Sequence, residues 1–237
     1  MVLENITHPD TTTIEKLNEH FNSLGVEERL LLLYEVFDTE EVLLTSSFGV
    51  DSALLLHLVS RVNPAQKVHF IDTGFHFPET YFYKKQLSKR FRLRVIDVSP
   101  PAQISELTRQ ARLWEKYPDA CCFLNKVSVL DALKPGFKVW ISGVRGHQTT
   151  HRSGLRFFTS ASVHGDLLKC CPLLDMGEKK SEAYKLKFKL PIHPLERQGY
   201  GSIGCLNCTV KGCGRNGRWA GQEKTECGLH QDHKNEN

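Results

Sequence analysis

The stretch Glu41-Val-Leu-Leu-Thr45, followed by Ser46-Ser-Phe-Gly-Val-Asp-Ser52, decides the fold of this chain. Its first five residues are typical of a short buried strand, and Ala53–Val62 is typical of a buried helix that ends before Asn63-Pro64. In α/β sheets, anions bind between the carboxyl end of a strand and the N-terminus of the next helix. The small residues that would surround such an anion are Ser46, Ser47, Gly49 and Ser52.

This loop is not a Walker A motif, because no Gly-Lys-Ser/Thr follows the glycine. An ordinary strand-to-helix turn with a serine cap is the alternative interpretation. The combination Ser-x-Gly-x-Asp-Ser at this place favours phosphate binding.

Outward from this loop, short apolar strands alternate with helices. Further strands are expected at Val68–Gly74, Leu93–Val98 and Lys138–Gly143, with a helix at Glu79–Phe91. The alternation predicts an α/β fold with a doubly wound, mostly parallel sheet. We expect three parts: N-terminal helices in residues 1–40 that pack on the core, a nucleotide-binding domain in 41–204, and a flexible cysteine-containing tail in 205–237. Residues 145–164 are expected to form a polar loop.

Composition limits the classes of function. The 237 residues are 40% hydrophobic, carry a net charge of +4 and contain eight cysteines. No apolar run approaches the roughly 20 residues of a membrane span, and the N-terminus lacks the pattern of a signal peptide. We therefore expect a cytoplasmic protein with no membrane partner, in which cysteines are metal ligands or catalytic thiols. The mild charge suits a small anionic substrate at least as well as nucleic acid, and no nucleic-acid partner is expected.

The C-terminal segment from Gly199 contains Cys205, Cys208, Cys213 and Cys227. Such a polar, glycine-rich segment is either a metal-binding module or one half of a redox site. Gly199-Tyr-Gly-Ser-Ile-Gly204 matches the dinucleotide motif GxGxxG, but a cysteine follows where a helix should begin, so that function is rejected.

Several motifs together carry a resemblance to a known family. The loop at 46–52 resembles the pyrophosphate loop of the adenine nucleotide α-hydrolase-like superfamily. Four further segments resemble motifs of the adenylyl-sulfate and phosphoadenylyl-sulfate reductases: Phe70–Tyr81, Gly143-Val-Arg145, Gly199–Cys205 and Glu226-Cys-Gly-Leu-His230. The similarity extends from about Leu43 to His230.

The resemblance implies a role for four cysteines. Cys121 and Cys122, with Cys205 and Cys208, would hold one 4Fe–4S cluster, and Lys126 would offset its negative charge. Zinc is the alternative metal, although four-cysteine zinc sites usually use two Cys-x-x-Cys pairs. The adjacent cysteines could also be small buried residues at a helix start.

The other cysteines differ from one another. Cys170 and Cys171 lie in an apolar run and are interpreted as packing residues, and Cys213 is left unassigned. Cys227 lies in a polar segment near basic residues and could be an incidental exposed cysteine. The family motif around it implies that it is the nucleophile.

The resemblance also implies the substrate contacts. Adenosine 5′-phosphosulfate (APS) would be bound by the serine-rich loop and by a further set of residues: Asp72, Thr73, Lys126, Gly143, Arg145, Arg152, Arg215, Arg218 and His230. Cys227 would attack the sulfate sulfur and form an S-sulfonate, and a separate thioredoxin or glutaredoxin-like protein would then release sulfite.

Other functions stay open at this point. The 3′-phosphorylated nucleotide PAPS, alone or with APS, is the alternative substrate. An ATP-dependent enzyme that thiolates tRNA is a more distant alternative, and a non-enzymatic iron–sulfur sensor or zinc-bound RNA module is a third. A homo-oligomer is compatible with the sequence.

Overall fold

The computed structural model describes residues 11–161 and 167–229. These residues form a six-stranded sheet in the order β3-β2-β1-β4-β6-β5, parallel except for β5, which pairs antiparallel with β6. The sheet confirms the predicted doubly wound α/β class. The strands are β1 (Val42–Thr45), β2 (Lys67–Ile71), β3 (Arg94–Val98), β4 (Val139–Ile141), β5 (Phe158–Ser160) and β6 (Leu168–Cys170).

Alternating side chains of the central strands divide between the two faces of the sheet. Val42 and Leu44 of β1 join the large hydrophobic cluster on one face, whereas Leu43 joins a smaller cluster on the other. Trp140 of β4 lies on the same side as Leu43. This is the period of two expected of a strand that is buried on both faces.

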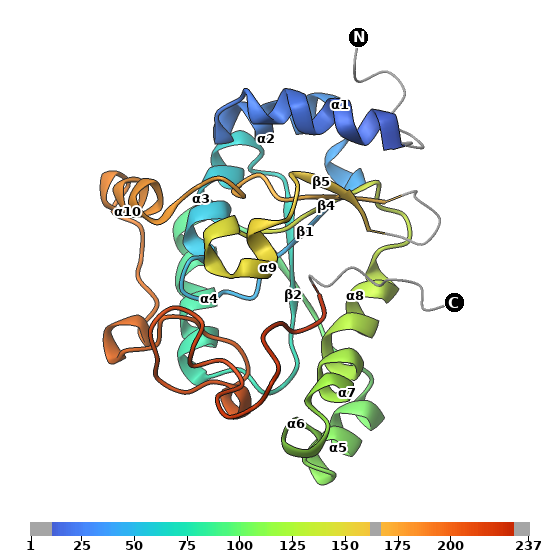
Figure 1. The fold of residues 1–237 in the computed structure, drawn as a ribbon, viewed down its shortest axis with the longest axis vertical. Helices are drawn as coiled ribbons and strands as arrows, with labels where there is room; N and C mark the ends of the chain where they lie inside the picture. Colours follow the sequence, from blue (N-terminus) through green and yellow to red (C-terminus); the bar gives the residue numbers. More distant parts are fainter. Residues whose placement is uncertain (1–10, 162–166, 230–237) are drawn as a thin grey trace.

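Helices cover both faces (Figure 1). The first group comprises α3 (Ser52–Val62), α4 (Pro78–Phe91) and α10 (Glu178–Lys187). The second comprises α5 (Ala102–Gln110), α6 (Leu113–Lys116), α7 (Pro118–Cys122), the π-helical turn η2 (Phe123–Val127) and α8 (Ser128–Leu133). Short helical segments elsewhere are η1 (Thr39–Glu41), η3 (Gly146–Gln148), α9 (Thr150–Ser153), η4 (Glu196–Gln198) and η5 (Leu206–Cys208).

The N-terminal helices α1 (Thr11–Asn22) and α2 (Val26–Val36) share the main core. Leu17 and Phe21 of α1 and Leu30 of α2 are at most 2% exposed and belong to the large cluster. Phe21 also contacts Phe158 of β5 edge-to-face, with ring centroids 4.5 Å apart. The sequence predicted helices that pack on the core in residues 1–40, of which the structure describes residues 11–40.

One part of the fold differs from the sequence interpretation. The region 145–164, expected to be a polar loop, contains α9 and the edge strand β5. The tail, for which the sequence predicts flexibility, lies against the sheet domain as far as Leu229 in this structure, with Cys205, Trp219 and Glu226 buried. Among the residues described, no helix combines the length and apolar character that a membrane span requires.

Candidate active site

A cleft of about 540 Å³ lies at the carboxyl ends of the central strands, between the loop after β1, α10 and the tail. Parallel α/β sheets bind ligands at this edge. The cleft brings together most of the residues that the sequence predicted for substrate contact and catalysis: Ser46, Ser47, Gly49, Ser52, Lys126, Gly143, Arg145, Arg152, Arg215, Arg218 and Cys227.

Two predicted substrate contacts lie elsewhere. Asp72 closes a turn, where its carboxylate accepts hydrogen bonds from the backbone N–H of Gly74 (2.9 Å) and the hydroxyl of Tyr81 (2.7 Å). Thr73 is buried beside Cys205, with 3.6 Å between Oγ1 and Sγ. Neither lines the cleft. The predicted contact His230 lies outside the described residues.

The loop after β1 is held in an uncommon backbone conformation. Phe48 has a φ of 48° and is completely buried, and its ring contacts Phe70 edge-to-face at 5.5 Å. Its backbone N–H donates to the hydroxyl of Ser46 over 3.2 Å. A left-handed conformation at a bulky residue is strained, and such strain is concentrated at binding sites. Packing of the Phe48 ring therefore fixes the shape of the loop.

Asp51 gives this loop a polar anchor that the sequence interpretation did not assign. Its carboxylate pairs with Arg145 and, over 3.0 Å, with the ammonium of Lys185 on α10. Arg145 also donates to the hydroxyl of Ser181 over 2.9 Å. Burial alone would lower the pKa of Lys185, but the charge of Asp51 and the hydrogen bonds that Lys185 makes outweigh it and raise this pKa. The loop is thus tied to α10 by fixed charges.

Unused hydrogen-bond donors surround the cleft. In Arg145, Arg215 and Arg218 the Nε atom is buried and finds no hydrogen-bond partner within the parts of the chain that are described. A buried guanidinium N–H without an acceptor is unfavourable. The same three guanidinium groups, with Lys126, bring positive charge to the lining of the cleft, and oxyanions are the usual partners of guanidinium. The cleft is therefore suited to an anionic ligand.

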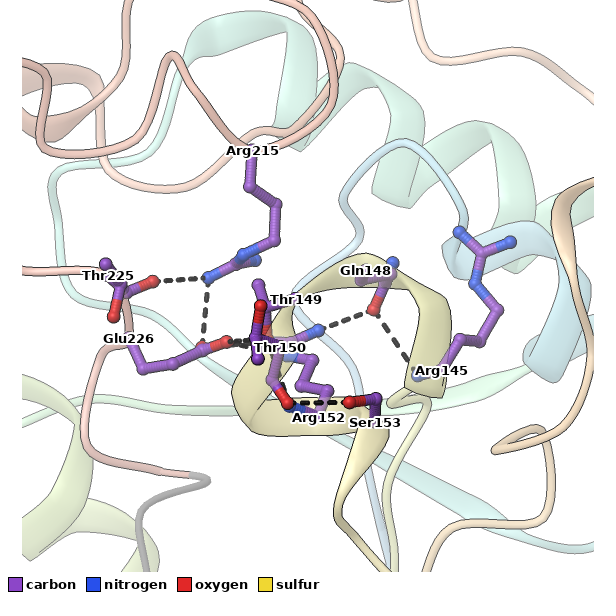
Figure 2. Close-up of polar contacts among 9 residues, drawn as sticks. All are labelled: Arg145, Gln148, Thr149, Thr150, Arg152, Ser153, Arg215, Thr225 and Glu226. Carbon is purple, nitrogen blue, oxygen red and sulfur yellow. Dashed lines mark hydrogen bonds and ion pairs between the residues drawn. The ribbon is translucent and has the colours of Figure 1, made fainter.

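Glu226 connects the tail to the cleft wall, as Figure 2 shows. Its carboxylate is hydrogen-bonded and ion-paired to Arg152 and Arg215, and the residue is only 2% exposed. The next residue, Cys227, is half-buried and lines the cleft. Sequence reasoning noted the motif around Cys227 but assigned no role to Glu226.

A second, smaller cavity is lined by the four cysteines that the sequence grouped together. Cys121 and Cys122 come from α7 and Cys205 and Cys208 from the root of the tail, although more than eighty residues separate the two pairs. Lys126 lines both this cavity and the cleft. Among the described residues, no group of three or more His, Cys, Asp and Glu side chains has the arrangement needed to coordinate a metal ion.

The four thiols of this cavity influence one another's ionisation. Burial, and then the neighbouring thiols of Cys122, Cys205 and Cys208, raise the pKa of Cys121 to about 12. Burial would also raise the pKa of Cys205, but Lys126, the hydroxyl of Thr73 and Arg218 lower it. As metal ligands all four would have to be thiolates, and a bound metal centre would supply the positive charge that stabilises them.

The remaining cysteines do not reach either cavity. Cys170 on β6 and Cys171 after it are 0% and 2% exposed, and Cys170 belongs to the main core, in keeping with the predicted packing role. Cys213 is exposed. All eight cysteines are free thiols.

Comparisons with known proteins relate this geometry to a family. The model of the phosphoadenosine phosphosulfate reductase domain matches residues 41–211. A protein of Bacillus mycoides named adenosine 5′-phosphosulfate reductase is 40% identical over 198 residues, which are 81% of this chain and 84% of that protein. A Bacillus cereus protein of the same name is 37% identical over 220 residues, covering 90% and 93% of the two chains.

Solved structures show the same fold at lower identity. The crystal structure of phosphoadenylyl-sulfate reductase from Candida auris superposes with a TM-score of 0.72 at 24% identity, covering 85% of this chain and 98% of that one. Yeast FAD synthetase in complex with FAD superposes with a TM-score of 0.55 at 16% identity, covering 89% and 73%.

Proposed function

The chain belongs to the phosphoadenosine phosphosulfate reductase domain family, and from that premise we propose that it reduces APS to sulfite and AMP through a covalent intermediate on Cys227. Members of this family are oxidoreductases that act on an activated sulfate. The observation that carries the proposal is that one cleft holds the serine-rich loop, the arginines with unused donors, and Cys227.

The first step is a substitution at sulfur. The thiolate of Cys227 attacks the sulfate sulfur of APS, the bond from that sulfur to the bridging oxygen breaks, and AMP leaves with the electron pair. Cys227 is left as an S-sulfonate. Two anions must meet in this step, and Lys126 and Arg218 supply positive charge from the cleft wall.

The second step needs a reductant, which we propose is a thioredoxin-like dithiol. One of its thiolates attacks the sulfur of Cys227, and sulfite leaves with the electron pair of the S–S bond. The second thiol then attacks the mixed disulfide and regenerates the Cys227 thiolate. The dithiol becomes a disulfide and supplies both electrons. Free thiols of this kind belong in a reducing compartment, so we place the protein in the cytoplasm.

We propose that Cys121, Cys122, Cys205 and Cys208 would hold a 4Fe–4S cluster, because these four thiols line one small cavity and four thiolates are the usual ligands of such a cluster. When bound, the cluster would supply a fixed charge centre that joins the root of the tail to α7. Protein groups already hydrogen-bond two of the sulfurs, since Thr73 contacts Cys205 and the amide of Asn125 contacts Cys121 at 3.9 Å. Such bonds are the usual means of tuning a thiolate-bound metal centre. Iron and labile-sulfide analysis distinguishes the cluster from zinc.

The decisive experiment is anaerobic incubation of the purified protein with APS, followed by mass spectrometry of the cysteine-containing peptides. A sulfonate on Cys227, and sulfite release only after thioredoxin is added, are expected. Cys213→Ser, which changes an exposed cysteine of the same tail, should behave as wild type. The proposal is wrong if Cys227→Ser releases sulfite at the wild-type rate.

Substrate choice is tested in the same assay. The names of the relatives and the four-cysteine pattern support APS, so kcat/KM should be higher for APS than for PAPS. Release of pyrophosphate from ATP, without sulfite, would instead identify an adenylating enzyme of the wider superfamily.

A further inference from the structure

We propose that Glu226 is a positioning residue, whose carboxylate latches the tail to Arg152 and thereby holds Cys227 at the cleft. The inference rests on the proposed function only in that Cys227 is taken as the nucleophile. The latch is the set of contacts among Glu226, Arg152 and Arg215 (Figure 2).

The latch has the geometry of a specific ion pair. Nε of Arg152 donates to one carboxylate oxygen of Glu226 over 2.7 Å, and Nη2 donates to the other over 2.9 Å. Arg215 adds a third hydrogen bond of 3.0 Å to the second oxygen. The side chains of Arg152 and Glu226 are 7% and 2% exposed. A two-point contact of guanidinium with carboxylate fixes orientation as well as distance.

Arg152 is itself held rigidly. Its backbone N–H donates over 3.1 Å to the hydroxyl of Thr149, which caps α9. Its Nη1 donates over 2.5 Å to Gln148 Oε1, and the same oxygen accepts the backbone N–H of Arg145 over 3.3 Å. Since Arg145 pairs with Asp51 in the loop after β1, the latch is built on the wall that would bind the nucleotide.

Burial makes the charge of Glu226 important. Burial alone would raise the pKa of Glu226, but the hydrogen bonds and charge of Arg152 and the charge of Arg215 outweigh it, so this pKa lies below the usual range. The carboxylate is ionised at neutral pH. Removing its charge would leave the buried guanidinium of Arg152 and the half-buried one of Arg215 without this counterion, which is strongly unfavourable.

Cys227 is held from both sides. Glu226 precedes Cys227 in the chain and forms the latch. Leu229, two residues after Cys227, packs against the smaller hydrophobic cluster, which contains Leu130 and Trp140. Consecutive Cα atoms are about 3.8 Å apart, so fixing Glu226 keeps the Cα atom of Cys227 beside the cleft wall. The first step needs Cys227 in the cleft, whereas the second needs its sulfur accessible to another protein. The latch therefore favours the closed arrangement that the first step requires.

The test measures access to Cys227 without relying on turnover. The rate of alkylation of Cys227 by iodoacetamide is followed by mass spectrometry in the holoenzyme, in Glu226→Gln and in the matched control Glu223→Gln, an exposed glutamate of the same tail. We expect Glu226→Gln to raise the rate about tenfold or more, as loss of a buried ion pair implies, and Glu223→Gln to leave it unchanged.

Catalysis gives the second readout. In Glu226→Gln, single-turnover formation of the S-sulfonate should slow, while sulfite release from preformed S-sulfonate should stay the same or accelerate. Glu226→Asp, which keeps the charge, should fall between wild type and Glu226→Gln and serves if Glu226→Gln folds poorly. Adding Arg152→Met to Glu226→Gln should have little further effect on alkylation, because both changes break one interaction.

Two results would overturn the latch: alkylation of Glu226→Gln at the wild-type rate, or equal slowing of both chemical steps. Failure of the proposed function looks different. The wild-type protein would then form no S-sulfonate on Cys227, or Cys227→Ser would still release sulfite, whatever Glu226→Gln does to the alkylation of Cys227.

Discussion

The guanidinium group of Arg218 packs directly against the backbone of Gly204, in the space that a Cβ atom at Gly204 would occupy. Its Nη1 donates to the carbonyl of Ile203 over 3.3 Å, and its carbon lies 4.4 Å from the centre of the Trp219 ring. Gly204 is the last of the three glycines that make residues 199–204 resemble a dinucleotide motif. Its lack of a side chain leaves room for Arg218, which lines the cleft.

Gly204→Ala should displace the Arg218 guanidinium, since a Cβ cannot share its space. A charge-assisted hydrogen bond contributes about 1.5–3 kcal/mol, so we expect kcat/KM for APS to fall by roughly tenfold to a hundredfold. Steady-state sulfite release measures this. Gly154→Ala, where a Cβ would make only ordinary contact, is the control. Equal kcat/KM in Gly204→Ala and wild type would show that Arg218 does not contact the substrate.

Gly228 has a φ of +85°, and a Cβ there would come within 3.2 Å of Val127. Gly228→Ala should strain the backbone next to Cys227 by about 1–2 kcal/mol and slow S-sulfonate formation roughly tenfold. Rapid-quench mass spectrometry follows the adduct. Gly221→Ala carries the same kind of strain (φ +80°) in open space and should have a smaller effect. Equal effects would mean that general strain in the tail, and not the position of Cys227, is responsible.

Lys126 is the only cation that lines both the cysteine cavity and the cleft within the described residues. Lys126→Met keeps the length of the side chain and removes its charge, so kcat should fall by about 10²–10³, the usual effect of losing one group that stabilises developing charge. Lys126→Arg should retain more activity. Lys134→Met, which changes the residue directly after α8 whose ammonium pairs with Asp131 instead, is the control. If Lys126→Met keeps the wild-type kcat, this lysine does not act on the reacting sulfur.

Local pattern explains what the sequence could predict. The strand β1, the turn at 46–52 and helix α3 follow one another directly in the sequence. Their periodicity and small residues can therefore be recognised within one short segment of the chain. The four cysteines were grouped through a family resemblance, and the structure places them around one cavity.

Contacts between distant residues explain what the sequence could not predict. Glu226 and Arg152 are 74 residues apart, and Asp51 and Lys185 are 134 apart, so no local pattern links either pair. Asp72 carries the carboxylate expected at a ligand contact, yet its bonds to Gly74 and Tyr81 use that carboxylate within the turn. Strand β5 is only three residues long, too short to show periodicity.

The buried imidazole of His193 should make stability depend on pH. It is 0% exposed, its Nδ1 accepts the backbone N–H of Leu195 over 3.2 Å, and burial lowers its pKa to about 4. An unfolded histidine has a pKa of about 6.5. Between about pH 6.5 and 4 the unfolded state therefore binds more protons than the folded state, and the free energy of unfolding decreases as the pH is lowered. From pH 7 to 5 His193 should account for a loss of about 2 kcal/mol in the free energy of unfolding. Urea titrations at both pH values measure this loss, and in His193→Gln it should be smaller by that amount. His20→Gln, which changes an exposed histidine, should keep the wild-type loss, and an unchanged loss in His193→Gln would show that His193 is not held neutral.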